Sequence, residues 1–243
     1  MSFPIVAGIT DLLGYQLTLD QTADIEWRDG HTPVSTRFDD PYFSVVNGLQ
    51  ETAHVYLTGN GLPGRFRPGF QIAELGFGTG LNLFAALQSW ALSGQQGKLH
   101  FTSFEAFPMA EQDMRQSLAA FPEILPFAEP FLAELTNGKR QFDLQDAFVD
   151  IVLGDARTTL PRWQGKADAW FLDGFSPAKN PELWEPALMQ SVADHTKPDG
   201  TFATYTAAGH VRKSLTDAGF AVQRISGFGR KRHMTIGKLA GRR

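Results

Sequence analysis

Several classes of protein are excluded by what the sequence lacks. It has no cysteine, which excludes disulfides, a cysteine nucleophile and any thiolate zinc or iron–sulfur site. No apolar stretch approaches the roughly 20 residues of a membrane span, and no basic segment followed by an apolar run stands at the N-terminus. The six histidines show no metal-ligand spacing such as His-Glu-x-x-His. We therefore expect a cytoplasmic protein that is not bound to a membrane and holds no metal.

The composition is that of an ordinary globular protein, with 42% hydrophobic and 20% charged residues in a chain of 243. Charge is unevenly distributed, because residues 209–243 contain nine Lys or Arg against the single acid Asp217. This end has a net charge of +8 and the remainder −12. A basic end on an acidic protein is either a polyanion-binding face or a solvated terminus, and composition does not decide between them.

The order of hydrophobic segments predicts two regions. Period-2 stretches between Gly, Asp and Pro, such as 15–19 and 54–57, predict a β-rich N-terminal extension over residues 1–66. Strands and helices then alternate over residues 67–243, which predicts an α/β domain with a Rossmann-like sheet of seven strands, the last one antiparallel. The strands are expected near 70–75, 99–104, 149–153, 167–172, 201–205, 221–225 and 233–238. The helices are expected near 81–91, 109–120, 157–162, 182–194 and 209–218, and a hairpin is expected between 140–144 and 148–153.

A glycine-rich turn at residues 74–80 is the sharpest local feature. The run Glu74-Leu75-Gly76-Phe77-Gly78-Thr79-Gly80 follows an apolar strand and opens a helix. Alternating glycines let the backbone turn tightly and approach a ligand, and the helix N-terminus offers free N–H groups to an anion. The nicotinamide fingerprint requires glycine at position 81, where this sequence has leucine. The spacing instead resembles the first motif of S-adenosylmethionine-dependent methyltransferases, with a purely structural turn as the alternative.

Acidic residues follow the next three strands of the predicted sheet. Glu105 stands where a carboxylate can accept both ribose hydroxyls of a cofactor, Asp155 where methyltransferases bind the adenine amino group, and Asp173 where the fourth strand ends. Because the carboxyl ends of parallel strands meet at one edge of a sheet, we expect these acids to surround one ligand. The expected cofactor-binding residues are Glu74, Gly76, Phe77, Gly78, Thr79, Gly80, Asn82, Glu105, Asp155, Ala156 and Asp173.

Longer runs of residues resemble one family. The run Ala169-Trp170-Phe171-Leu172-Asp173-Gly174-Phe175-Ser176-Pro177-Ala178-Lys179-Asn180-Pro181-Glu182-Leu183-Trp184 resembles the signature of the MnmC methyltransferase domain. Residues 25–27, 32–35, 38–44, 47–52 and 227–234 extend the resemblance over nearly the whole chain. It implies N-methylation of 5-aminomethyl-uridine, 2-thiolated or not, at wobble position 34 of tRNA, with the anticodon loop as partner and S-adenosylmethionine as cofactor. Two-domain members carry a C-terminal flavin-dependent oxidase that this chain lacks, so a stand-alone methyltransferase without FAD is expected.

The resemblance and the chemistry together give each site residue an expected role. Asp173 is the candidate to accept an amine N–H and to relay the proton to water. The other expected substrate-binding residues are Asp40 in the pocket wall, Phe175 and Trp184 stacked on the uracil or facing the cationic centre, Pro177 shaping the loop, Lys179 as a minor cation, and Arg230, Lys231 and Arg232 on phosphates. A rival assignment gives the chemistry to Asp39-Asp40-Pro41-Tyr42, which resembles the acidic loop of amino-methyltransferases.

Two other functions remain open at this point, because a fold and a cofactor loop do not identify the acceptor. The first is an S-adenosylmethionine-dependent N-methyltransferase acting on a small-molecule or protein amine. The second is a binding module without catalytic activity.

Overall fold

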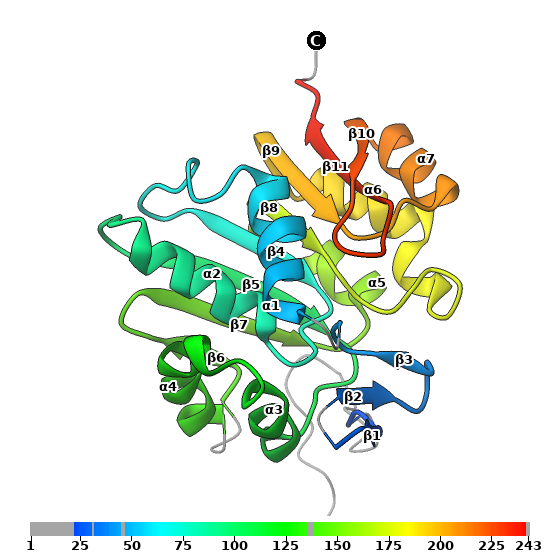
Figure 1. Cartoon of the computed structure of the whole chain (residues 1–243). Coiled ribbons are helices and arrows are strands. Elements are labelled where there is room, and N and C mark those ends of the chain that lie inside the picture. The colour runs from blue at the N-terminus through cyan, green and yellow to red at the C-terminus, as the bar shows by residue number, and fades with distance from the viewer. Residues whose placement is uncertain (1–21, 31, 45–46, 136–138, 242–243) are drawn as a thin grey trace, which may run out of the picture.

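The computed structural model describes residues 22–30, 32–44, 47–135 and 139–241. An eight-stranded sheet with helices on both faces dominates the structure, and a small three-stranded sheet lies near its carboxyl edge (Figure 1). The large sheet has the strand order β10-β11-β9-β8-β4-β5-β7-β6. Its strands are β4 (Gln71–Leu75), β5 (Leu99–Glu105), β6 (Gln141–Asp143), β7 (Ala147–Leu153), β8 (Ala167–Leu172), β9 (Thr196–Thr204), β10 (Phe220–Ser226) and β11 (His233–Leu239).

The predicted Rossmann-like sheet is confirmed. Strands β7, β5, β4, β8 and β9 are parallel neighbours, and β11 runs antiparallel to both β9 and β10. The eighth strand, β6, pairs antiparallel with β7 and forms the hairpin expected from residues 140–144. A mixed sheet of this order places the ends of β4, β5, β7 and β8 side by side at one edge.

Helices cover the two faces of the sheet in two groups. One hydrophobic core lies under α2 (Leu81–Leu92), α3 (Glu111–Leu118) and α4 (Leu125–Leu135), and the other lies under α5 (Ala156–Thr159), α6 (Pro186–Asp194) and α7 (Gly209–Asp217). The sequence did not predict α4, which contains Pro130, a residue that ordinarily argues against a helix interior. Short 3₁₀ turns occupy Thr58–Asn60, Pro122–Ile124, Leu160–Arg162 and Pro181–Trp184. No helix within the described ranges is long and apolar enough to cross a membrane.

The N-terminal region is only partly β. Strands β1 (Ile25–Arg28), β2 (Thr32–Ser35) and β3 (Asp40–Pro41) form the small antiparallel sheet, but α1 (Gly48–Thr52) and a π-helical turn, Ala53–Leu57, follow it. The strand predicted at 54–57 is therefore wrong. Three consecutive side chains there, Val55, Tyr56 and Leu57, are buried in the main core, whereas a strand with one solvated face buries alternate residues. The strand predicted at 15–19 lies outside the described residues.

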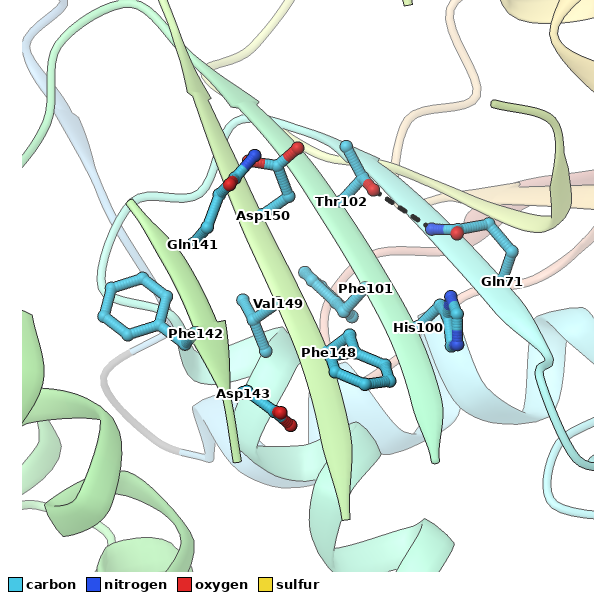
Figure 2. A pocket seen from close by; sticks show the side chains of 10 residues that line it. All are labelled: Gln71, His100, Phe101, Thr102, Gln141, Phe142, Asp143, Phe148, Val149 and Asp150. Atoms are coloured by element: carbon cyan, nitrogen blue, oxygen red, sulfur yellow. Dashed lines mark hydrogen bonds between the residues drawn. The ribbon is translucent and has the colours of Figure 1, made fainter. Parts of the chain in front are cut away.

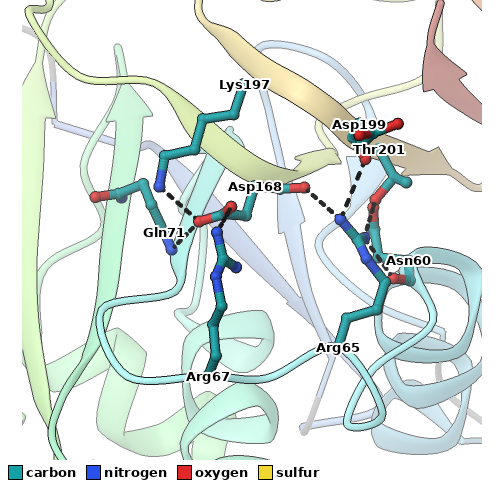
Figure 3. Close-up of polar contacts among 8 residues, drawn as sticks. All are labelled: Asn60, Arg65, Arg67, Gln71, Asp168, Lys197, Asp199 and Thr201. Atoms are coloured by element: carbon teal, nitrogen blue, oxygen red, sulfur yellow. Dashed lines mark hydrogen bonds and ion pairs between the residues drawn. The ribbon is translucent and has the colours of Figure 1, made fainter.

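Ion pairs fasten the chain at the amino edge of the sheet. Near the start of β8, the buried carboxylate of Asp168 accepts hydrogen bonds from Arg67 Nη2 at 2.6 Å and Lys197 Nζ at 2.7 Å (Figure 3). It also accepts the backbone N–H of Gln71 at 2.8 Å. Arg65 donates to the backbone oxygen of Asp168 at 3.0 Å, so the segment before β4 is tied to β8 at several points. This network fixes β4 against β8 and leaves their carboxyl ends free for a site.

Candidate functional site

A cavity of about 1420 Å³ opens at the carboxyl ends of β4, β5, β7 and β8. Ligand pockets for one small molecule usually measure about 300–1,000 Å³, so this cavity has room for more than one ligand group. Most residues predicted to bind a cofactor line it: Gly76, Phe77, Gly78, Thr79, Asn82, Glu105, Asp155, Ala156 and Asp173. Two do not, since Glu74 lies behind the loop and Gly80 faces the ring of Phe84.

A second hollow, of about 330 Å³, lies on the surface of β5, β6 and β7 (Figure 2). Gln141, Phe148 and Asp150 are among its lining residues, and burial raises the pKa of the Asp150 carboxyl. None of the residues predicted to bind cofactor or substrate lines this hollow. The large cavity is therefore the candidate site.

The glycine-rich turn packs closely against the end of β8. Gly76 has a φ of 82°, and a Cβ added there would lie 3.3 Å from the backbone oxygen of Asp173 and 3.3 Å from Cα of Gly174. Glycine tolerates this left-handed conformation at little cost, whereas a side chain would also push the turn away from β8. The turn therefore lies directly beside Asp173.

Glu105 holds the turn from the side of β5. Its Oε2 accepts the backbone N–H of Gly78 at 2.9 Å, and its Oε1 accepts that of Phe107 at 2.7 Å. The side chain is 8% exposed and lines the cavity. Because a carboxylate has about four lone-pair sites, two acceptor sites are left for hydroxyl groups of a ligand.

Asp155 begins the short helix α5 at the end of β7. Its Oδ1 accepts the backbone N–H of Arg157 at 2.8 Å, which is an N-cap, and the Arg157 guanidinium lies 2.6 Å from its Oδ2. The hydrogen bonds from the Arg157 side chain are the main cause that holds the pKa of this carboxyl below its usual value. Asp155 is thus a charged acceptor at the cavity wall, beside Ala156.

Asp173 shares an amide donor with a second acid. Asn82 Nδ2 donates to Asp173 Oδ2 at 2.8 Å and to Glu74 Oε1 at 2.8 Å. Ser103 Oγ donates to Glu74 Oε2 at 2.7 Å, so both oxygens of this fully buried acid have neutral partners. Burial raises the pKa of both carboxyls, and for Glu74 the rise is large. For Asp173 the hydroxyl of Tyr56 is the main opposing influence.

The helical segment 48–57 supplies cavity residues that the sequence did not single out. Thr52 Oγ1 donates to Asn82 Oδ1 at 3.0 Å, which fixes the direction in which the Asn82 amide points. Glu51 and Tyr56 also line the cavity. The sequence does contain a signal for this helix, because asparagine is a preferred N-cap residue. In the structure, Asn47 caps α1 by accepting the backbone N–H of Gln50.

Aromatic rings from the N-terminal region form one wall of the cavity. Phe38 stacks on Phe175 with ring centroids 4.7 Å apart, and Tyr42 meets Phe175 edge-on at 5.1 Å. Asp40 Oδ2 accepts the backbone N–H of Ser176 at 2.9 Å, which ties this wall to the loop after β8. The structure thus places Asp40 in the pocket wall.

Two residues of the loop after β8 lie elsewhere than expected. Trp184 was expected to stack on the base, but its side chain is 2% exposed and sits in the core under α6. Its Nε1 donates to the backbone oxygen of Phe175 at 3.0 Å, so it supports the loop from behind. The ring packs against the apolar side chains under α6. Spacing along the sequence does not reveal this contact. Pro177 does not line the cavity either.

The expected cations differ in how they are paired. Lys179 lies 3.5 Å from Asp39 Oδ2 and 3.7 Å from Asp40 Oδ1, so it joins the loop to the N-terminal wall. Lys231 Nζ lies 2.7 Å from Glu51 Oε1 and 4.3 Å from the ring centroid of Tyr205, so it points into the cavity.

Arg230 and Arg232 are exposed on the hairpin between β10 and β11, and neither makes an ion pair with a described residue. Arg230 lines the mouth of the cavity, whereas Arg232 lies outside it. The described part of the chain contains no group of three or more acidic or histidine side chains placed to hold a metal ion.

Comparison with known proteins adds a family to this geometry. Residues 122–240 match the model of a family described as S-adenosyl-L-methionine-dependent methyltransferase. Two curated relatives are named tRNA 5-methylaminomethyl-2-thiouridine biosynthesis bifunctional protein MnmC. The one from Leptospira borgpetersenii is 43% identical over 89% of this chain and 35% of that protein. The one from Chromobacterium violaceum is 44% identical over 90% of this chain and 34% of that protein. The chain thus spans about a third of the length of these relatives.

Solved structures with the same fold include two informative ones. The crystal structure of MNMC2 from Aquifex aeolicus has a TM-score of 0.71 and 28% sequence identity, and the match covers 92% of this chain and 72% of that one. Spermidine synthase from Thermotoga maritima has a TM-score of 0.51 at 12% identity, with coverage of 89% of this chain and 72% of that one. The second likeness concerns the fold alone.

Proposed function

We infer the function from one premise: the chain belongs to the family of S-adenosyl-L-methionine-dependent methyltransferases. We propose that it methylates the primary amine of 5-aminomethyl-uridine, 2-thiolated or not, at wobble position 34 of tRNA, giving 5-methylaminomethyl-uridine. The names of the curated relatives point to this nucleoside. The observation that carries the proposal is that the glycine-rich turn and Asp173 line one cavity.

The turn and the two carboxylates at the carboxyl edge of the sheet fit this cofactor. The turn at Gly76 and Gly78 has φ values of 82° and 52°, and it leaves backbone close to the cavity where a side chain would fill the space. We propose that this turn holds the amino-acid end, that Glu105 accepts the ribose hydroxyls, and that Asp155 accepts the adenine amino group. The two acceptor sites left on Glu105 suit the ribose hydroxyls. Asp155 would accept the amino group in place of one of its hydrogen bonds from the Arg157 side chain.

When bound, S-adenosylmethionine supplies a methyl group attached to a positively charged sulfur. The acceptor must present a nitrogen lone pair to that methyl, but a free alkylamine is mostly protonated at neutral pH. The amine releases one proton to water before it reacts. Asp173 then accepts an N–H of the neutral amine, which directs the lone pair to the methyl, and takes up the proton that the nitrogen loses as the N–C bond forms. Because burial raises the pKa of Asp173, this carboxylate is a better proton acceptor than an exposed aspartate.

Orientation supplies much of the remaining rate enhancement. Holding two reactants in line is worth roughly 7–11 kcal/mol in favourable cases. Asn82 and the backbone N–H of Gly174 each hold one oxygen of Asp173, both at 2.8 Å, so the carboxylate has a fixed direction. Phe175 and Phe38 offer apolar ring surface at the cavity wall, which suits a flipped pyrimidine base.

An RNA substrate also requires cations outside the reaction centre. An anticodon loop presents phosphates around an unpaired base, and Arg230 and Arg232 lie on the hairpin at or near the cavity mouth without an ion pair among the described residues. We propose these two arginines as phosphate contacts. Lys231 takes a different part, because its ammonium is already paired with Glu51.

Nucleoside analysis tests the proposal directly. Purified protein is incubated with S-adenosylmethionine and tRNA that bears 5-aminomethyl-uridine, and the digested tRNA is separated by chromatography. We expect 5-methylaminomethyl-uridine to form with the wild-type protein and not with Asp173→Asn. Methylation of free amines or of protein lysines, without any change in the tRNA, would replace this proposal with the small-molecule or protein N-methyltransferase. Cofactor binding with no turnover on any acceptor would indicate a binding module.

A further inference from the structure

A rare turn of helix places Tyr56 at the catalytic edge. Helix α1 continues into a π-helical turn, Ala53–Leu57, before the 3₁₀ turn at Thr58–Asn60. π-Helical turns are uncommon and occur frequently at functional sites, because the extra residue per turn moves a side chain out of the ordinary helical position. Here the displaced side chains include Tyr56, which lines the large cavity.

The backbone and the ring of Tyr56 are held firmly against β8. Asn60 Nδ2 donates to the backbone oxygen of Tyr56 at 2.9 Å and to that of Trp170 at 3.2 Å. The Tyr56 ring packs on the ring of Phe171, with centroids 5.4 Å apart and planes inclined by 33°. Phe171 precedes Asp173 by two residues, so both side chains leave β8 on the face that Tyr56 covers.

The hydroxyl of Tyr56 faces the Asp173 carboxylate, but it makes no hydrogen bond of ordinary length and angle with a described residue, although the side chain is only 4% exposed. A buried hydroxyl without a well-formed hydrogen bond is costly to the fold, and a ligand that enters the cavity could satisfy its oxygen. Burial and the nearby Asp173 carboxylate raise the pKa of Tyr56, so the hydroxyl stays protonated. Tyr205, a partly buried tyrosine at the cavity, differs because its hydroxyl donates to the backbone oxygen of Gly174 at 2.9 Å.

We infer that Tyr56 is a second amine-binding residue of the reaction: its hydroxyl oxygen accepts one N–H of the acceptor amine while the Asp173 carboxylate accepts another. The inference rests on the proposed methylation. In that reaction the amine nitrogen forms a bond to the methyl carbon. The bond from that carbon to sulfur breaks with its electron pair passing to sulfur, and the nitrogen loses one proton to Asp173.

Two acceptors are what a directed lone pair requires. A neutral primary amine has two N–H groups and one lone pair, so fixing both N–H groups fixes the direction of the lone pair. One acceptor would leave the amine free to rotate about its single hydrogen bond. The other charged groups that face this position, Glu51 and Lys231, form an ion pair with each other at 2.7 Å, which leaves Asp173 and Tyr56 for the substrate.

The substitution Tyr56→Phe tests the inference, because it removes the hydroxyl and keeps the ring that packs on Phe171. We expect kcat/KM for 5-aminomethyl-uridine in tRNA to fall by about 10- to 100-fold, mostly through kcat. We expect the melting temperature to stay the same or rise, because the buried hydroxyl that is lost makes no well-formed hydrogen bond. In contrast, Tyr205→Phe should lower the melting temperature, since it removes the donor to Gly174.

Each other outcome counts against the inference. Turnover within twofold of wild type in Tyr56→Phe would overturn it and leave the proposed function intact. A drop in melting temperature that accounts for the whole loss of turnover would make Tyr56 a structural residue. Absence of turnover in the wild-type protein would overturn the proposed function, and the inference with it.

Discussion

The two ends of β8 hold acids of opposite character. At the amino edge, burial raises the pKa of Asp168, but the Gln71 N–H, Lys197 and Arg67 outweigh burial and keep that pKa below its usual value. At the carboxyl edge, burial raises the pKa of Asp173, and the groups that oppose burial most are neutral: the Tyr56 hydroxyl, a backbone N–H and the Asn82 amide. The amino edge pairs its charge to stabilise the fold, whereas the carboxyl edge keeps an acid in a state suited to accept a proton.

The largest expected effect comes from removing the acid at the carboxyl edge. Asp173→Ala should lower the methylation rate by about 10³-fold or more, because general base catalysis and amine orientation are lost together. The free energy of unfolding should change by less than about 1 kcal/mol, since burial of this carboxyl already weakens the fold at neutral pH. Methylation assays and urea unfolding measure the two effects on one preparation.

Asp40→Ala is the matched comparison for this variant. Asp40 holds the pocket wall through the Ser176 N–H, so we expect a smaller loss of activity than in Asp173→Ala. The opposite result, with activity kept in Asp173→Ala and lost in Asp40→Ala, would move the chemistry to the acidic loop of residues 39–42.

Removing the acid at the amino edge should have the opposite profile. Asp168→Asn leaves Arg67 and Lys197 without their shared anion, and we expect the free energy of unfolding to fall by about 2–3 kcal/mol. The loss is smaller than for a wholly buried pair, because both cations are partly exposed. Activity per folded molecule should stay near the wild-type level. If Asp168→Asn were as stable as wild type but inactive, the amino edge would not serve stability alone, and the proposed difference between the two edges would be wrong.

Sequence position predicted the carboxyl edge well, for a topological reason. Glu105, Asp155 and Asp173 each follow a parallel strand, and such positions meet at one edge whatever the details of packing. Asp168 lies near the start of the strand that Asp173 follows, five positions earlier, and nothing in the sequence indicates that one is paired with cations and the other is not. That difference depends on Arg67 and Lys197, which reach β8 from other elements.

The residues that prediction missed or misplaced depend on tertiary contacts. Tyr56 was predicted to lie in a strand, because residues 54–57 fit a period-2 pattern. In the structure, the side chains of residues 55–57 are all buried in a π-helical turn. Lys231 was grouped with Arg230 and Arg232, although only Lys231 turns inward to Glu51. Trp184 stands beside the signature loop in sequence but packs in the core. In each case side-chain direction decides the role, and spacing along the chain does not determine it.

The two exposed arginines of the hairpin between β10 and β11 provide a third test. Arg230→Gln with Arg232→Gln should weaken binding to the anticodon loop and make the salt dependence shallower. Each phosphate contact to single-stranded RNA contributes about −0.7 to the slope of log affinity against log salt, so the slope should change by about 1.4 if each arginine makes one contact. Fluorescence anisotropy with labelled tRNA at several salt concentrations measures it.

The control for this double variant removes the same charge elsewhere. Lys213 and Lys238 are exposed and pair with Asp217 and Asp199. The double variant Lys213→Gln with Lys238→Gln should leave the slope unchanged, because neither lysine lies at the cavity. An equal change in both double variants would mean that net charge alone attracts the RNA, and that the hairpin is not its docking face.

The smallest expected effect is a difference between the two edges in how the stability of the fold depends on pH. The pKa of Glu74 is raised well above 4.5 by burial, so the folded protein binds its proton more tightly than the unfolded chain and gains stability as pH falls through that raised pKa. Glu74→Gln should therefore be more stable than wild type at pH 8, by roughly 1 kcal/mol, and the difference should shrink on acidification and vanish below the ordinary value of 4.5. Asp168 has the reverse sign, because its lowered pKa stabilises the fold above 3.8 and that contribution disappears as pH falls through the lowered value. Thermal melting of wild type, Glu74→Gln and Asp168→Asn between pH 3 and pH 8 would show both trends, and parallel curves for the two variants would mean that the edges do not differ in their electrostatics.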